Sequence, residues 1–170
     1  MNRRQLLVGG VSILSLAALY RFAVRVPPVD AATFAVSHTD DEWRKLLSPA
    51  QYDVLREQGT EQPGSSPLLD EHRVGTFHCA GCDLAVFSST TKFDSGTGWP
   101  SFWAPIEGGI ATSVDNSLFM ERTEVHCARC GGHLGHVFSD GPPPTGLRYC
   151  MNSVSLRHVS EGEPLELVQR

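Results

Sequence analysis

Two pairs of cysteines constrain this chain more than any other feature of its sequence. Each pair has the spacing C-x2-C: one is Cys79 and Cys82, and the other is Cys127 and Cys130. Each pair follows a His and precedes a Val-Phe-Ser segment, which indicates that the same tight turn, here called a knuckle, is built twice. Four thiolates brought together by two such turns are typical of a structural zinc site. The spacing therefore predicts a fold organised around zinc.

Two other uses of these cysteines stay open at the level of sequence. Disulfides are common in exported proteins. A C-x2-C pair closed on itself makes a small, strained loop, but cross-linked pairs are compatible with the spacing. A mixed site is the second alternative, with His133 or His136 in place of a thiolate. His78 and His126, which directly precede the knuckles, are interpreted as packing residues.

Composition favours one domain. With 170 residues, of which 41% are hydrophobic, the chain can bury one core but is too short for two full domains. A mean hydropathy of −0.15 excludes a polytopic membrane protein. The net charge of −5 gives nucleic acid no electrostatic reason to bind.

Short apolar runs bounded by Gly, Ser, Asp and Pro follow one another from residue 74 onward. No helix-length periodic pattern separates them, which favours antiparallel sheets over a parallel α/β core. Before them, Thr39 and Ser48 each have a Glu or Gln three residues later, which predicts two N-capped helices, the second ended by Gly59. The predicted fold class is mainly β with short N-terminal helices. The expected strands are 76–77, 85–87, 110–114, 118–120, 123–125, 136–138, 147–151 and 154–156.

Residues 1–31 form a separate segment. Arg3 and Arg4 precede an apolar run over residues 6–20, which is shorter than the ~20 residues that span a bilayer. The paired arginines resemble a twin-arginine signal peptide, which sends folded proteins across the bacterial inner membrane, and Ala31 offers a cleavage site. An uncleaved N-terminal membrane anchor is the alternative. Both interpretations place the domain in the periplasm or another extracytoplasmic compartment, and export after folding would allow zinc to be loaded in the cytoplasm.

The fifth cysteine, Cys150, belongs to neither pair. An odd cysteine in an exported protein is either an inert buried thiol or a reactive one. Because alternate residues of a strand share a face, Arg148 and Asn152 are expected beside Cys150. Tyr149 and Met151 would then lie on the opposite face. A guanidinium lowers the pKa of a nearby thiol, and an amide can hold a substrate oxygen, so the pattern favours a catalytic cysteine.

Two other groups of residues carry chemistry. His133, His136 and Asp140 follow the second knuckle and form a second group of functional side chains. Trp99 and Trp103 lie in a loop rich in Gly and Pro, where indoles make an apolar wall for a small ligand group. A plain packing role is the alternative for this loop.

Taken together, these motifs resemble the methionine sulfoxide reductase B family. The resemblance extends from about Asp40 to Val159 and includes LSPAQY at 47–52 and GTE at 59–61. Its most specific parts are the two C-x2-C pairs, KFDSG (92–96), GWPSF (98–102), GHLGHVFSDG (132–141) and LRYCMNS (147–153). It divides the chain into the signal segment or anchor (1–31), a linker (32–39), the reductase domain (40–160) and a C-terminal tail (161–170).

The resemblance implies a β fold of two small antiparallel sheets and an enzyme that reduces the R epimer of methionine sulfoxide, free or in proteins. In the implied mechanism, the Cys150 thiolate attacks the sulfoxide sulfur and becomes a sulfenic acid, while Trp99 holds the methyl group. The implied zinc ligands are Cys79, Cys82, Cys127 and Cys130. The other implied site residues are His133, His136, Asp140, Arg148 and Asn152.

One position departs from the family pattern. Many members carry a second cysteine in the Gly-x-Gly-Trp loop, which resolves the sulfenic acid, and here that position is Thr97. With four cysteines bound to zinc, no resolving thiol remains. The departure implies that Cys150 is recycled by an external thiol, such as a thioredoxin-like or glutaredoxin-like protein or a small dithiol.

Two rival classes would use some of the same residues. A four-cysteine zinc module could be a binding domain for protein or nucleic acid, but it would need a basic face. Residues 32–170 carry a net charge of −8, from ten basic and eighteen acidic residues, which opposes that class. A Cys/His hydrolase would also use Cys150, but it requires an oriented base and an oxyanion hole. The combined motifs favour the reductase.

Overall fold

The computed structural model describes residues 34–117 and 121–163. Residues 1–31, interpreted as a signal or an anchor, lie outside the described residues, as do the expected strand at 118–120 and the end of the tail. Within the described ranges, the structure contains no helix that is long and apolar enough to cross a membrane.

Two short helices open the described chain, α1 (Asp40–Leu46) and α2 (Pro49–Glu57). Both begin with the predicted capping boxes, in which the side chains of Thr39 and Ser48 accept N–H bonds from the third helical residue. The end of α2 differs from the prediction, because Gln58 rather than Gly59 adopts the left-handed conformation. Gly59 is needed there for space: a Cβ at this position would lie 2.2 Å from a carboxylate oxygen of Asp53.

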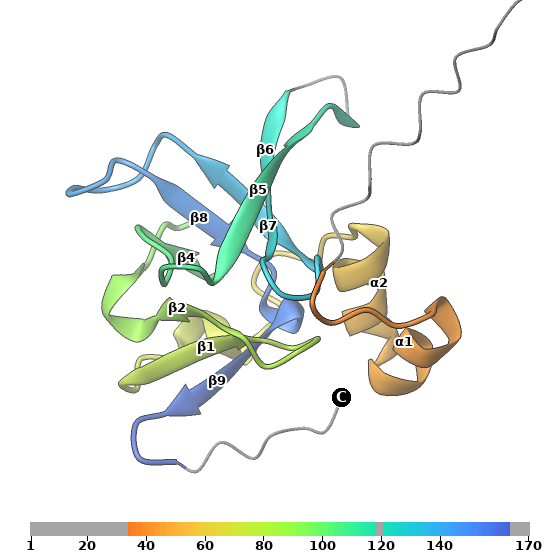
Figure 1. Ribbon diagram of the computed structural model, residues 1–170. Coiled ribbons are helices and arrows are strands. Elements are labelled where there is room, and N and C mark those ends of the chain that lie inside the picture. Colours follow the sequence, from red (N-terminus) through yellow and green to blue (C-terminus); the bar gives the residue numbers. More distant parts are fainter. Residues whose placement is uncertain (1–33, 118–120, 164–170) are drawn as a thin grey trace, which may run out of the picture. The chain divides into compact units, whose positions relative to one another are not determined.

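The strands form two antiparallel sheets, which confirms the predicted fold class. The first sheet has the order β2-β1-β9 and the second has the order β3-β4-β8-β7-β6-β5 (Figure 1). In Figure 1 the two helices lie together next to β7. The strands are β1 (Gly75–Cys79), β2 (Ala85–Ser88), β3 (Lys92–Phe93), β4 (Ser101–Phe102), β5 (Ile110–Asp115), β6 (Arg122–Cys127), β7 (His133–Phe138), β8 (Arg148–Met151) and β9 (Leu156–Ser160).

The strand predicted at 154–156 is wrong over its first two residues. Residues Ser153–Ser155 form a 3-10 turn, η4, and β9 starts only at Leu156. The cause is a distant side chain, because the carboxylate of Glu61 accepts the backbone N–H groups of Ser153 and Val154. A carboxylate that holds two successive N–H groups favours a tight turn over an extended strand. The two-residue strands β3 and β4 were too short to be predicted from periodicity.

A single hydrophobic core joins the helices, both sheets and the knuckles. Phe77 and Phe87 from the first sheet pack against Phe102 from the second, with ring centroids 5.0 and 4.4 Å away. Trp43 and Leu55 bring the two helices into the same core. The knuckle cysteines are part of this core, so their sulfur atoms are held by packing on all sides.

Candidate active site

The four knuckle cysteines converge in one buried cluster. Cys79 ends β1 and Cys127 ends β6, and each is followed by a turn that returns the second cysteine of its pair. All four sulfur atoms lie within 4.8 Å of one another. Two cross-pair distances are 3.7 Å, from Cys79 to Cys130, and 3.5 Å, from Cys82 to Cys127.

These distances test what the cluster can hold. Four sulfurs at about 2.3 Å from a tetrahedral zinc ion lie about 3.8 Å from one another, whereas a disulfide requires about 2.05 Å. The spacing therefore fits a metal ion, and all five cysteines of the chain are free thiols in the structure. The mixed Cys/His alternative is not needed, because the four sulfurs already complete a tetrahedral donor set.

Cys150 lies on β8 in the interior of the six-stranded sheet. Its register partner on β4 is Ser101, and its register partner on β7 is His136. Directly opposed residues of an antiparallel pair have Cβ atoms about 4.5–5.5 Å apart on the same face. The topology therefore places an imidazole beside the thiol. Gly135 makes this close approach possible, because a Cβ there would lie 2.1 Å from the carbonyl oxygen of Cys150.

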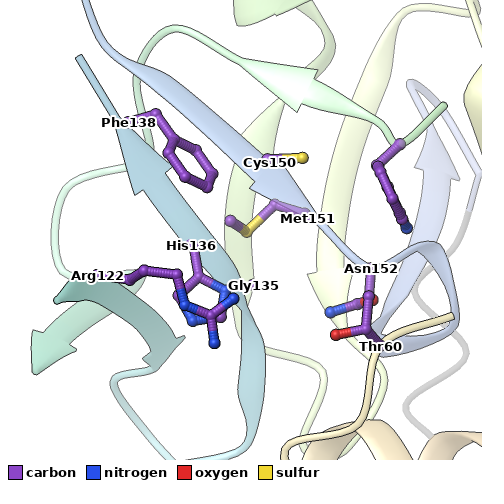
Figure 2. Close-up of a pocket in the computed structure, with 9 residues that line it drawn as sticks. Thr60, Arg122, Gly135, His136, Phe138, Cys150, Met151 and Asn152 are labelled. Atoms are coloured by element: carbon purple, nitrogen blue, oxygen red, sulfur yellow. The ribbon is translucent and has the colours of Figure 1, made fainter. Parts of the chain in front are cut away.

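A cavity of about 150 Å³ opens above the thiol (Figure 2). Its lining combines apolar and polar groups: Thr60, Trp99, Arg122, Gly135, His136, Phe138, Cys150, Met151 and Asn152. Met151, which was expected on the opposite face, also contributes to the lining. Of the two loop indoles, Trp99 lines this cavity and Trp103 does not. The arrangement offers an apolar wall and a thiol to one small ligand group.

The surroundings of Cys150 act on its protonation in opposite directions. Burial raises the pKa of the thiol, while the hydroxyl of Thr97, 3.9 Å away, and the charge of Arg148 lower it. Burial has the larger effect, so the pKa of Cys150 lies above its ordinary value. Arg148 therefore lowers the pKa of the thiol, as expected, but its effect is smaller than that of burial.

The two histidines of the GHLGHVF motif occupy different places. His136 lines the cavity, and its Nε2 lies 2.8 Å from Oδ2 of Asp115. His133 is 3% exposed and does not line the cavity. Its Nδ1 lies 2.8 Å from a carboxylate oxygen of Glu124, and its ring meets that of His136 edge-on at 5.3 Å. The structure thus places His136 in the cavity, in register with Cys150, and keeps His133 out of the cavity lining.

Asp140 and Arg148 form a bidentate pair with two N–O distances of 2.9 Å. The guanidinium also lies over the ring of Phe138, 4.5 Å from its centroid. The paired charge raises the pKa of Arg148 and lowers that of Asp140. Asp140 is exposed and holds Arg148 rather than lining the cavity, so its contact with the site is indirect.

Asn152 and Trp99 are tied to one another through Glu61. The Oδ1 of Asn152 accepts the backbone N–H of Glu61 at 3.1 Å, and its Nδ2 donates to the carbonyl of Leu134 at 3.2 Å. The indole N–H of Trp99 donates to the carbonyl of Glu61 at 3.2 Å. Glu61 therefore fixes both cavity residues, in addition to holding η4 through its carboxylate.

Sequence reasoning missed four residues that shape the site. Arg122 and Phe138 line the cavity, Asp115 holds His136, and Glu124 holds His133. No local spacing marks Asp115, Arg122 and Glu124, because strand pairing brings them to the site. Phe138, by contrast, follows His136 by two residues on the same face of β7. For Arg122 and Asp115 the available signal was their opposite charge at the facing ends of β6 and β5, where they are register partners. His78 and His126 were interpreted as packing residues. Nδ1 of His78 bonds the backbone carbonyl of Asp83, and the ring of His126 packs edge-on against Phe34.

A mainly β domain with a four-thiol cluster that could hold a metal ion, and with a separate thiol on a small cavity, is typical of enzymes that use a reactive cysteine. Comparison with protein families places the chain within this class. The family model described as the SelR domain matches residues 47–160. The chain belongs to this family, the methionine sulfoxide reductase B family.

Three relatives carry the name peptide methionine sulfoxide reductase MsrB. The Pseudomonas putida protein is 58% identical over 71% of this chain and 92% of its own length. The Leptospira interrogans protein is 50% identical over 75% and 98%. The Methanosarcina barkeri protein is 54% identical over 76% and 92%. These comparisons cover most of this chain and nearly all of each relative.

Proposed function

We propose that this protein reduces methionine R-sulfoxide, free or in proteins, to methionine through Cys150. The observation that supports it most directly is the position of the Cys150 thiol on a cavity walled by Trp99, with His136 opposite on the next strand. The volume of about 150 Å³ admits one methionine side chain with its sulfoxide but not a folded partner. Relatives at 50–58% identity are named for this activity.

The first step transfers oxygen from one sulfur to another. The sulfur of Cys150 attacks the sulfoxide sulfur, the sulfoxide oxygen receives a proton, and the S–O bond of the substrate breaks. The oxygen then bonds to the Cys150 sulfur as the bond between the two sulfur atoms breaks, so methionine leaves as the thioether and Cys150 is left as a sulfenic acid. One thiol and one sulfoxide thus give one sulfenic acid and one thioether. Trp99 and Phe138 provide the apolar surface against which the methyl group packs, which selects one epimer.

The other site residues orient this reaction. His136 is the titratable group nearest to the thiol by strand register, so it moves the proton between Cys150 and the sulfoxide oxygen. His133 supports His136 from behind. Arg148, held by Asp140, supplies positive charge near the sulfur as it becomes a thiolate. Asn152 holds the loop that carries Glu61 and thereby the position of Trp99.

The metal that we assign to the four-thiol cluster is zinc. Cys79, Cys82, Cys127 and Cys130 would hold it, and its contribution is to folding. The cluster connects the end of β1 to the end of β6 and therefore fixes the two sheets to each other. None of the reacting groups that line the cavity is a ligand.

Regeneration of Cys150 requires a thiol from outside the chain. In the Gly-x-Gly-Trp loop, the side chain that approaches the sulfur of Cys150 is Thr97, and its hydroxyl cannot form a disulfide. The sulfenic acid reacts with an external thiol to give a mixed disulfide and water, and a second thiol releases Cys150. A thioredoxin-like or glutaredoxin-like protein is the partner of this chemistry. We place it outside the cytoplasm, together with the enzyme, because residues 1–31 resemble a twin-arginine signal or an anchor.

The test is turnover of the two separate epimers of a dabsylated methionine sulfoxide, with dithiothreitol as reductant. We expect consumption of the R epimer only, and no turnover of either epimer by the Cys150→Ser variant. Equal turnover of both epimers would contradict the proposed cavity, and full activity in Cys150→Ser would contradict the proposed nucleophile. The Thr97→Ser variant, which keeps a hydroxyl beside the thiol, serves as a matched control and should behave like the wild type.

A further inference from the structure

Asp115 and Arg122 lie next to the reacting groups, yet the steps above give neither of them a role. Asp115 ends β5, Arg122 begins β6, and the two are register partners. Oδ2 of Asp115 accepts from Nη2 of Arg122 at 2.7 Å and is 2.8 Å from Nε2 of His136. Its Oδ1 accepts the backbone N–H of Ser117 at 2.8 Å. The carboxylate is therefore fixed by a main-chain donor, a guanidinium and an imidazole.

These contacts decide where the proton of His136 lies. Hydrogen bonds from Ser117 and His136, and the charge of Arg122, hold the pKa of Asp115 far below its ordinary value. An ionised carboxylate can only accept hydrogen bonds, so Nε2 of His136 must carry a proton. In the neutral ring, Nδ1 then has the free lone pair.

Nδ1 is also the nitrogen left for the cavity. Nε2 is occupied by Asp115, while His136 lines the cavity opposite Cys150. Figure 2 shows Arg122 and His136 together on one wall of the cavity, with Cys150 on the neighbouring strand. A neutral ring with a free Nδ1 can accept the thiol proton, which the raised pKa of Cys150 leaves in place at neutral pH.

We infer that Asp115, kept in place by Arg122, is a positioning residue that fixes His136 in the Nε2–H tautomer, so that Nδ1 serves Cys150 and the sulfoxide oxygen. The inference rests on the proposed function and adds the direction of proton movement. Nδ1 accepts the Cys150 proton as the sulfur attacks, and it gives the same proton to the sulfoxide oxygen as the S–O bond breaks. The proton is conserved within the step, and no further donor is required.

The groups around the imidazole set the expected pH dependence. They are Asp115 on β5, Arg122 and Glu124 on β6, His133 on β7, and Cys150 on β8. Burial, Arg122 and His133 lower the pKa of His136, and Asp115 alone among the groups named raises it. Removal of the Asp115 charge therefore lowers the pKa of His136 further. Because the neutral ring is the active form in this scheme, the acidic limb of the rate profile moves to lower pH.

The first test reads the tautomer directly by two-dimensional ¹H–¹⁵N NMR of the imidazole in the full-length, metal-loaded protein. We expect the Nε2–H form in the wild type and a mixture with the Nδ1–H form in Asp115→Asn. A wild-type ring in the Nδ1–H form overturns the inference, and so does an unchanged tautomer in the variant. The wild-type result stands even if the variant does not fold. Because no substrate is involved, this result is independent of whether the protein reduces methionine sulfoxide.

The second test is the pH profile of a single turnover with methionine R-sulfoxide. We expect Asp115→Asn to react about tenfold more slowly, with its acidic limb at lower pH, and Asp115→Glu to recover part of the rate. Glu71→Gln is the matched control, since Glu71 is another Arg-paired carboxylate but lines a different groove. It should leave the profile unchanged. A loss of thermal stability in Asp115→Asn with an unshifted profile would show a structural role only and would refute the inference.

Discussion

Substitution of Glu61 is the change whose effect on stability follows most directly from the structure. Its carboxylate accepts the N–H groups of Ser153 and Val154, and its backbone binds Asn152 and Trp99. In Glu61→Ala, both N–H groups of η4 lose their acceptor. Each such loss costs about 1–3 kcal/mol, and because the site is only part-buried and water can reach it, we expect about 2–4 kcal/mol in total.

The measurement is the free energy of unfolding from denaturant titration, together with Tm and the KM and kcat of the reductase assay. For a domain of this size, the predicted loss corresponds to a Tm roughly 10 °C lower. A displaced Trp99 should also reduce kcat/KM by about tenfold or more, since positioning errors of about 1 Å have effects of this size.

A matched control separates this effect from the loss of any surface carboxylate. Glu57 pairs with Arg44 at 3.7 Å, but both side chains are more than half exposed. Glu57→Ala should therefore change the unfolding free energy by no more than about 1 kcal/mol and leave kcat/KM unchanged. If Glu61→Ala is as mild as this control, then the Glu61 carboxylate does not support η4 or keep the loop around Trp99 in place, and the reasoning fails.

Four shorter predictions follow from the cluster, the cavity and the carboxylates. Cys79→Ser should give poorly soluble, zinc-depleted protein by metal analysis, whereas Cys150→Ser should stay folded with a full zinc content; loss of zinc from the latter would contradict the assignment. Trp99→Ala should lose turnover of the R epimer while its unfolding curve shows a folded domain, and retained activity would exclude the indole wall. Thr97→Cys should form a disulfide with Cys150 after one turnover, visible in a peptide map, whereas the wild type should show one dimedone-reactive sulfenic acid; a wild-type disulfide to a knuckle cysteine would refute external recycling. His133 lowers the pKa of Glu124 to about 2, so Glu124 contributes stability that is present above about pH 4.5 and is lost as the pH falls through 2. Glu124→Gln should therefore flatten the loss of stability in this range, and an unchanged acid titration of the unfolding free energy would count against it.

Local patterns were sufficient for the parts of the fold that depend on neighbours in the chain. The two capping boxes form within four residues, and each knuckle is a turn within four residues, so both could be predicted. The strand alternation around Cys150 put Arg148 near the thiol, and the charge of Arg148 does act on it. The sign of the net pKa shift could not be predicted in this way, because burial outweighs the neighbouring charge.

The sequence by itself thus determined the β class, the four-thiol cluster and the position of Cys150 as the one cysteine outside that cluster. Each of these depends on short spacings or on motif content. Tertiary structure alone decided which histidine faces the thiol and what holds it. Asp115 and His136 are 21 residues apart, and Glu61 and Ser153 are 92 apart. Their contacts depend on the register of β5, β6 and β7 and on the path of the loop after α2. A one-residue change of register would turn the side chain of Asp115 or His136 to the other face of the sheet, and no local pattern encodes that choice.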